Sequence, residues 1–123
     1  MKTNRKVLIV EDEAVLAMLY ERRLKSRGYI ITGTATTKED AVRLAFENPP
    51  DFILIDIRLA GDIDGIDAVR EITARISTRT IFMSGYNNEN IKNKALELHP
   101  LAYLIKPFEI KELLSYMEQA NNK

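Results

Sequence analysis

Five residues with acidic, hydroxyl or amine side chains come directly after apolar runs of the sequence. The runs are rich in Ile, Leu, Val or Phe, and the polar residues at their ends are Glu11 and Asp12, Asp56, Ser84, and Lys106. Short runs of this kind are typical of strands buried on both faces of a sheet. In an open α/β sheet, chemistry collects outside the carboxyl ends of the strands. The pattern therefore predicts that these five residues meet at one edge of a sheet.

Such a group of residues has a definite chemistry. Three carboxylates held close together repel one another, and a divalent cation relieves that repulsion. Ligation by carboxylate oxygens, without His or Cys, suits Mg²⁺. With the cation and Lys106 neutralising an incoming phosphoryl group, the Asp56 carboxylate could attack phosphorus and form an aspartyl phosphate. The residue types thus indicate a phosphoryl-accepting site centred on Asp56.

Strand and helix patterns alternate along the chain and supply the elements that would carry these residues. Strands are predicted over residues 6–10, 29–35, 52–55, 80–83 and 101–105, and a helical apolar stripe follows each of them. Five such alternations favour one parallel sheet covered on both faces. Right-handed crossovers and short connections favour the strand order 2-1-3-4-5. The predicted fold class is α/β, a doubly wound five-stranded parallel sheet of flavodoxin-like topology.

Local signals predict where the helices begin and which faces they bury. Thr36 and Glu39 have the spacing of a capping box for the second helix. Asp64 is expected to cap the third helix, which begins at Gly65. The first helix should face the core with one apolar stripe, made of Leu16, Leu19, Tyr20 and Leu24.

The overall composition predicts a single globular domain over residues 1–123. The chain is 46% hydrophobic and 29% charged, and its eighteen basic and eighteen acidic residues cancel. No net charge therefore draws it to nucleic acid or to an acidic membrane. It has no cysteine, which excludes disulfides and thiolate metal sites. The first apolar run ends at Glu11 and is too short for a signal peptide, so a cytoplasmic location is expected.

Four short motifs resemble those of one known family in both order and spacing. They are VEDE after the first predicted strand, LID after the third, FMSG after the fourth and LIKPF after the fifth. Together they resemble the receiver domain of two-component response regulators over essentially the whole chain.

The resemblance implies a role for each matching residue. Asp56 is expected to be the phosphoacceptor. Mg²⁺ would be bound directly by Asp12 and Asp56, through a water by Glu11, and by the backbone carbonyl of Arg58. Ser84 and Lys106 would contact the bound phosphoryl group, and Tyr103 would be the aromatic residue that moves with the hydroxyl. A cis peptide bond is expected between Lys106 and Pro107.

The loop after Asp56 departs from the commonest family pattern. It reads RLAGDIDGI, without the usual proline and methionine. Arg58, two residues after Asp56, and Tyr86, two residues after Ser84, are both large. In the family these two positions flank the phosphoryl group, so the pair is expected to tune its lifetime.

The expected function is that of a switch in a phosphorelay. A phosphohistidine on a sensor histidine kinase or phosphotransfer protein would donate to Asp56, and the output would pass to an unidentified downstream protein. Autodephosphorylation is expected, without turnover of a separate substrate and without nucleic-acid or membrane binding through this domain. Two alternatives stay open: a receiver-like binding module that works without phosphorylation, and a receiver fragment of a longer regulator or hybrid kinase.

Two other functions fit the sequence poorly. Phosphatases of the haloacid dehalogenase type need a second Asp where this chain has Arg58. A flavodoxin-like cofactor carrier needs a loop that attracts phosphate after the first strand, and here three acids, Glu11-Asp12-Glu13, would repel it.

Overall fold

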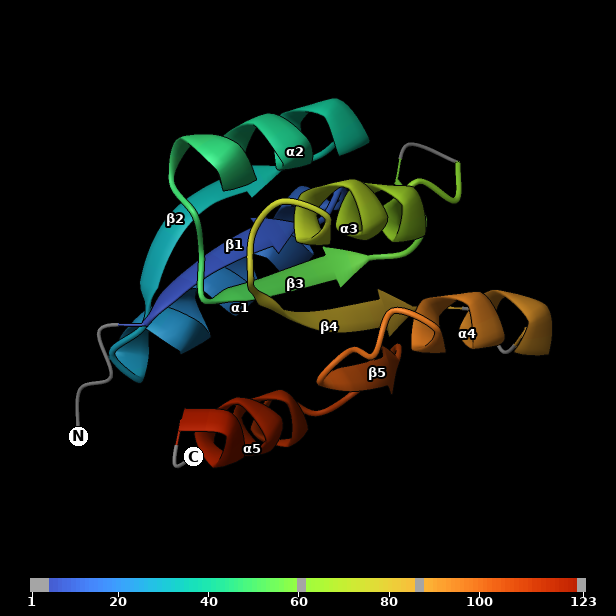
Figure 1. Ribbon diagram of the computed structural model, residues 1–123. Coiled ribbons are helices and arrows are strands. Elements are labelled where there is room, and N and C mark those ends of the chain that lie inside the picture. Colours follow the sequence, from blue (N-terminus) through green and yellow to red (C-terminus); the bar gives the residue numbers. More distant parts are fainter. Residues whose placement is uncertain (1–4, 60–61, 86–87, 122–123) are drawn as a thin grey trace.

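Five parallel strands form one sheet at the centre of the molecule. The computed structural model describes residues 5–59, 62–85 and 88–121. The sheet has the order β2-β1-β3-β4-β5, which confirms the predicted topology (Figure 1). The strands are β1 (Lys6–Val10), β2 (Ile30–Ala35), β3 (Phe52–Asp56), β4 (Arg79–Ser84) and β5 (Ala102–Ile105).

A helix follows each strand, and the helices cover both faces of the sheet. They are α1 (Ala14–Ser26), α2 (Lys38–Glu47), α3 (Gly65–Thr73), α4 (Glu89–Leu96) and α5 (Ile110–Asn121). Buried residues of α1 and α5 belong to one core cluster, and those of α2, α3 and α4 to the other (Figure 1). Within the described ranges, none of the helices has the length and apolar character needed to cross a membrane.

The central strands are apolar on both sides because helices cover both faces. Val7 and Ile9 of β1 belong to the cluster under α1 and α5, whereas Leu8 and Val10 belong to the opposite cluster. All four side chains are fully buried. Successive side chains of a strand point to opposite faces of the sheet. Because helices cover both faces here, every residue of the run VLIV is buried and apolar.

Helix α1 buries a narrower face than its sequence predicts. Its buried residues are Ala17, Tyr20 and Leu24, whereas Leu19 is 42% exposed. The expectation that Leu19 faces the core was wrong, because the sheet contacts a stripe centred on Tyr20. Leu19 instead shares an outer surface with Val15 and Met18, which are 79% and 61% exposed. Residues spaced by three and four positions lie on one side of a helix, so these three form an exposed apolar stripe.

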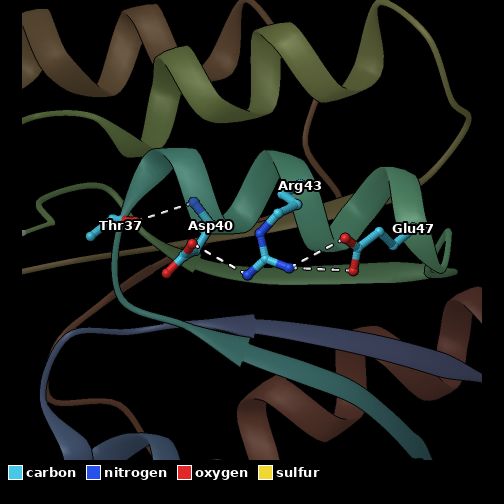
Figure 2. A network of polar contacts seen from close by, with 4 residues as sticks. All are labelled: Thr37, Asp40, Arg43 and Glu47. Atoms are coloured by element: carbon cyan, nitrogen blue, oxygen red, sulfur yellow. Dashed lines mark hydrogen bonds and ion pairs between the residues drawn. The ribbon is translucent and has the colours of Figure 1, made fainter.

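Helix α2 begins one residue later than the predicted capping box. The Thr37 hydroxyl, and not that of Thr36, accepts a hydrogen bond from the Asp40 backbone N–H at 3.2 Å. Arg43 then forms ion pairs at 3.3 Å with Asp40 and with Glu47 on the exposed side of the helix (Figure 2). Ion pairs at this spacing add a few tenths of a kcal/mol each to helix stability.

Candidate functional site

The carboxyl ends of four strands bring the predicted polar residues to one edge of the sheet. In the parallel register Asp56 lies opposite Met83, and Ser84 lies opposite Ile105. The Ile57 N–H donates to the Met83 carbonyl at 2.9 Å, and the Lys106 N–H donates to the Ser84 carbonyl at 2.8 Å. These bonds fix the residues just beyond the strands, so the position of each functional side chain follows from the sheet.

Lys106 joins two of the acids. Its ammonium donates a hydrogen bond to Asp56 Oδ2 at 2.5 Å and another to Glu11 Oε1 at 2.7 Å. Burial acts to lower the pKa of Lys106, but the hydrogen bonds to Asp56 and Glu11 outweigh it and raise that pKa above its usual value. The ammonium therefore keeps its charge at neutral pH, where it balances part of the negative charge of the site.

Glu11 is the most deeply buried of the acids. It is 1% exposed, and this burial raises the pKa of its carboxyl group, while Lys106 offsets part of the increase. Its second oxygen accepts a weak hydrogen bond from the Glu13 N–H at 3.3 Å. A buried carboxylate with one cationic partner has capacity for further positive charge.

The three acids also converge in the way a cation site requires. One carboxylate oxygen each from Glu11, Asp12 and Asp56 lies within 4.8 Å of the other two. Asp56 Oδ1 accepts a hydrogen bond from the Arg58 N–H at 2.9 Å, which orients the carboxylate. Oxygen ligands without His or Cys suit a hard divalent cation. The acidic cluster thus fits a metal ion.

Gly65 packs directly against the backbone of Asp56 and Ile57, a contact that was not predicted from the sequence. Its N–H donates to the Ile57 carbonyl at 2.8 Å. A Cβ atom here would lie 2.3 Å from the Asp56 carbonyl oxygen and 2.8 Å from Ile57 Cα, so only glycine fits. The predicted cap by Asp64 was wrong, because that side chain makes no capping hydrogen bond and its backbone is already helical. A glycine at the first position of the third predicted helix was the available signal.

Comparison with known proteins decides the family of this chain. Residues 7–118 match the response regulator receiver domain. The chain belongs to the response regulator receiver family. Its function is therefore that of a receiver domain of response regulators, a class of domain used in phosphorelay signalling.

Individual relatives agree with this assignment. The receiver domain is 34% identical over 116 residues to the transcriptional regulatory protein PdtaR of Mycobacterium tuberculosis, covering 94% of this chain and 56% of that protein. The chain thus spans about half the length of this curated relative. The signal receiver domain of a modulated diguanylate cyclase from Desulfovibrio desulfuricans is 32% identical, with a TM-score of 0.87 over 96% of this chain and 94% of that one. The response regulator domain of Thermotoga maritima CheB is 29% identical, with a TM-score of 0.83 over 97% of both chains.

Three further predictions for the receiver domain fall on residues that the structure describes, and one does not. Ser84 is 1% exposed at the end of β4. The Lys106–Pro107 peptide bond is cis, as expected. Arg58 is half-buried two residues beyond Asp56, whereas Tyr86 lies outside the described residues.

Tyr103 lies on β5, beside α4. Its ring packs against the core cluster under α2, α3 and α4, and the Lys92 ammonium lies 5.8 Å from the ring centroid. Its hydroxyl is buried and has no hydrogen-bond partner within residues 5–59, 62–85 and 88–121.

Proposed function

We propose that this receiver domain accepts a phosphoryl group on Asp56 from a phosphohistidine of a sensor histidine kinase or phosphotransfer protein. The observation that carries the proposal is the position of the Lys106 ammonium, which contacts Asp56 and Glu11 together at the edge where Asp12 also lies. A positive charge beside an oriented carboxylate is what phosphoryl transfer requires, because the reaction depends mainly on positioning and charge neutralisation.

The residues of the chain have distinct tasks in the transfer. An oxygen of the Asp56 carboxylate forms a bond to phosphorus as the bond between phosphorus and the donor histidine nitrogen breaks. The Lys106 ammonium, now bonded to Asp56 Oδ2 at 2.5 Å, moves onto an oxygen of the arriving group. Mg²⁺ would supply further positive charge for those oxygens, and the residues that would hold it are Asp12, Asp56, the Arg58 carbonyl and, through a water, Glu11. The Arg58 N–H keeps the carboxylate oriented at 2.9 Å.

The new charge then acts on the residues of β4 and β5. Ser84 donates its hydroxyl to the phosphoryl group, and Tyr103 responds on the neighbouring strand. The surface formed by α4, β5 and α5 changes as a result. Such a switch is a two-state element biased by a local change in charge.

Arg58 and Tyr86 occupy the two sequence positions that flank the phosphoryl group in the family, and this pair tunes the lifetime of the phosphoryl group against water. The half-buried position of Arg58 beside Asp56 supports its part in this proposal. The test replaces both residues with small polar ones and measures loss of the phosphoryl group from the purified protein. An unchanged dephosphorylation rate would exclude tuning by this pair.

The proposal also covers the setting of the domain. Residues 1–123 form one domain, located in the cytoplasm, that autodephosphorylates without turning over a separate substrate.

The exposed stripe of Val15, Met18 and Leu19 on α1 follows closely after Asp12 and suits an apolar surface of the donor protein. The output passes through a protein partner, and the domain acts either alone or as the receiver part of a longer regulator or hybrid kinase.

The direct test is incubation of the protein with acetyl phosphate and Mg²⁺, followed by intact mass spectrometry. We expect one phosphoryl group on the wild type, and none on Asp56→Asn or in excess chelator. No adduct on the wild type, or an equal adduct on the variant, overturns the proposal. The first of these outcomes favours a binding module that works without phosphorylation.

A further inference from the structure

An aromatic ring of α1 stacks on a ring of the loop that carries Lys106. Tyr20 of α1 and Phe108 have ring centroids 5.9 Å apart, and their planes differ by 9°. Tyr20 is 4% exposed and belongs to the core cluster under α1 and α5, and Phe108 packs against the same cluster. A buried stack of this kind has a defined geometry, because the two rings restrict one another.

Phe108 is two residues from Lys106 in a segment without regular structure. Strand β5 ends at Ile105 and α5 begins at Ile110, so residues 106–109 form the connection. On its strand side, this connection is fixed by the Lys106 N–H, which donates to the Ser84 carbonyl at 2.8 Å. On its helix side, Phe108 is fixed by the stack with Tyr20.

Tyr20 also lies within the electrostatic reach of the site. Burial raises the pKa of its hydroxyl to about 12, and the charges of Lys106, Glu11 and Asp56 act on the same hydroxyl with opposing signs. Helix α1 follows β1, which carries Glu11 and Asp12 at its end. One helix therefore places its ring under the lysine loop while the preceding turn carries the acids.

We infer that Tyr20 is a positioning residue for Lys106, holding through Phe108 the loop that places the ammonium on Asp56 and Glu11. The inference rests on the proposed phosphoryl acceptance by Asp56. Charge neutralisation in phosphoryl transfer depends strongly on position, and a displacement of about 1 Å can slow a reaction about a hundred-fold. Loss of the stack frees Phe108, so the ammonium is then held less firmly where the phosphoryl oxygens arrive.

The chain contains a second aromatic pair that serves as a matched control. Tyr29 is also 4% exposed, belongs to the same core cluster, and contacts Phe52 with ring centroids 6.0 Å apart. Phe52 is the first residue of β3, so this pair lies at the amino end of the sheet, opposite the site. The Tyr29 hydroxyl also accepts a hydrogen bond from Asn121 at 2.9 Å, so replacing Tyr29 removes this bond as well as a buried ring.

The experiment compares phosphorylation rates of full-length variants by acetyl phosphate and Mg²⁺, normalised to the folded fraction measured by circular dichroism. We expect Tyr20→Leu to be slower than wild type by about ten-fold or more. Tyr20→Phe keeps the ring, and Tyr29→Leu leaves the lysine loop intact, so both should stay within about two-fold of wild type. Equal rates for Tyr20→Leu and Tyr29→Leu overturn the inference. An unphosphorylated wild type overturns the proposed function instead.

A double-mutant cycle separates positioning from general loss of packing. Phe108→Leu should slow phosphorylation as Tyr20→Leu does, and the double variant should be no slower than either, because the two rings act through one contact. If the rate effects of the two single substitutions multiply in the double variant, Tyr20 does not act through Phe108. This result would also overturn the inference. Phe108 is partly exposed, so Phe108→Leu is expected to fold. If Tyr20→Leu does not fold, the phosphorylation rate of Phe108→Leu is compared with that of Tyr29→Leu instead.

Discussion

Lys106 and Asp56 contact each other although their strands do not. Strand β5 pairs with β4 at the edge of the sheet, yet the Lys106 ammonium reaches Asp56 at the end of β3 and Glu11 at the end of β1. One side chain thus links the edge strand to the centre of the sheet across β4. We expect this contact to contribute to stability as well as to the proposed chemistry.

Replacing Lys106 with Met should lower the free energy of unfolding in the absence of Mg²⁺. Glu11 is 1% exposed and would lose its cationic partner, which costs about 1–3 kcal/mol for a buried polar group. The measurement is urea unfolding followed by circular dichroism, with and without Mg²⁺. Lys111→Met is the control, because that side chain is 84% exposed and its ion pair with Glu109 is long, at 3.8 Å. Equal stability of the two variants contradicts a role for the buried contact.

Replacing Asp12 with Asn should stabilise the metal-free protein and abolish stabilisation by Mg²⁺. The substitution removes one of three neighbouring carboxylates that repel one another, and it also removes a proposed metal ligand. Unfolding by urea at several Mg²⁺ concentrations measures both effects. Glu13→Gln removes a neighbouring acid outside the group of three and should leave the response to Mg²⁺ intact. Persistence of that response in Asp12→Asn argues against the cation site.

Gly65→Ala should destabilise the domain by about 1–3 kcal/mol, the usual effect of overpacking. The new Cβ would lie 2.3 Å from the Asp56 carbonyl oxygen. This oxygen belongs to the backbone of β3, so it cannot move away by a change of side-chain rotamer. Gly33→Ala is the matched control, because its Cβ meets the Leu44 Cδ1 atom at 3.3 Å and that side chain can shift. Comparable unfolding midpoints in urea for the two variants would contradict close packing of the start of α3 against the end of β3.

The stability of the domain should fall above pH 10 partly through Tyr20. The unfolded chain loses the Tyr20 proton near its ordinary pKa of 10.0, whereas burial raises the folded-state pKa to about 12. The folded state then binds more protons in this window, so stability decreases with rising pH, by about 2–3 kcal/mol at the upper end. Tyr20→Phe should reduce this loss and leave the pH dependence below pH 9 unchanged. Urea unfolding in steps from pH 8 to 12 tests this, and identical curves for both proteins contradict it.

Thr37→Ala should destabilise helix α2 by about 1 kcal/mol, because the Asp40 N–H loses its hydrogen-bond acceptor. Thr36→Ala provides the control, since Thr36 is exposed and precedes the cap. Thermal unfolding of both variants should show a lower midpoint for Thr37→Ala alone. The reverse order would restore the capping box expected from the sequence.

The strand order and the convergence of Glu11, Asp12, Asp56 and Lys106 were predictable because both depend on local patterns. Each buried strand is a short apolar run, and each polar residue of the site stands directly at the end of one, so parallel pairing brings Asp56 and Lys106 together. Other features depend on how elements pack. Thr36 and Thr37 are equally good caps by type, and the chain path into α2 selects Thr37. Helical spacing alone does not say that Leu19 stays exposed.

The support inferred for Tyr20 was hidden for the same reason. It acts through a contact with Phe108, which is distant in the chain, and a single sequence contains no record of which residues touch. The apolar spacing of α1 identifies Tyr20 as a core residue and gives no hint of Phe108 as its partner. A comparison of pairwise changes between related sequences would be the way to find such contacts without coordinates.

The span of the Lys106 contacts has a consequence for protein synthesis. Asp56 leaves the ribosome fifty residues before Lys106, and Glu11 leaves ninety-five residues before it. At a synthesis rate of about 5–20 residues per second, Lys106 is added between a few seconds and about twenty seconds after the two acids. A nascent chain therefore carries Asp56 long before it carries Lys106. On the proposed function, a chain can accept phosphate efficiently only after Lys106 has been synthesised and has folded against both acids.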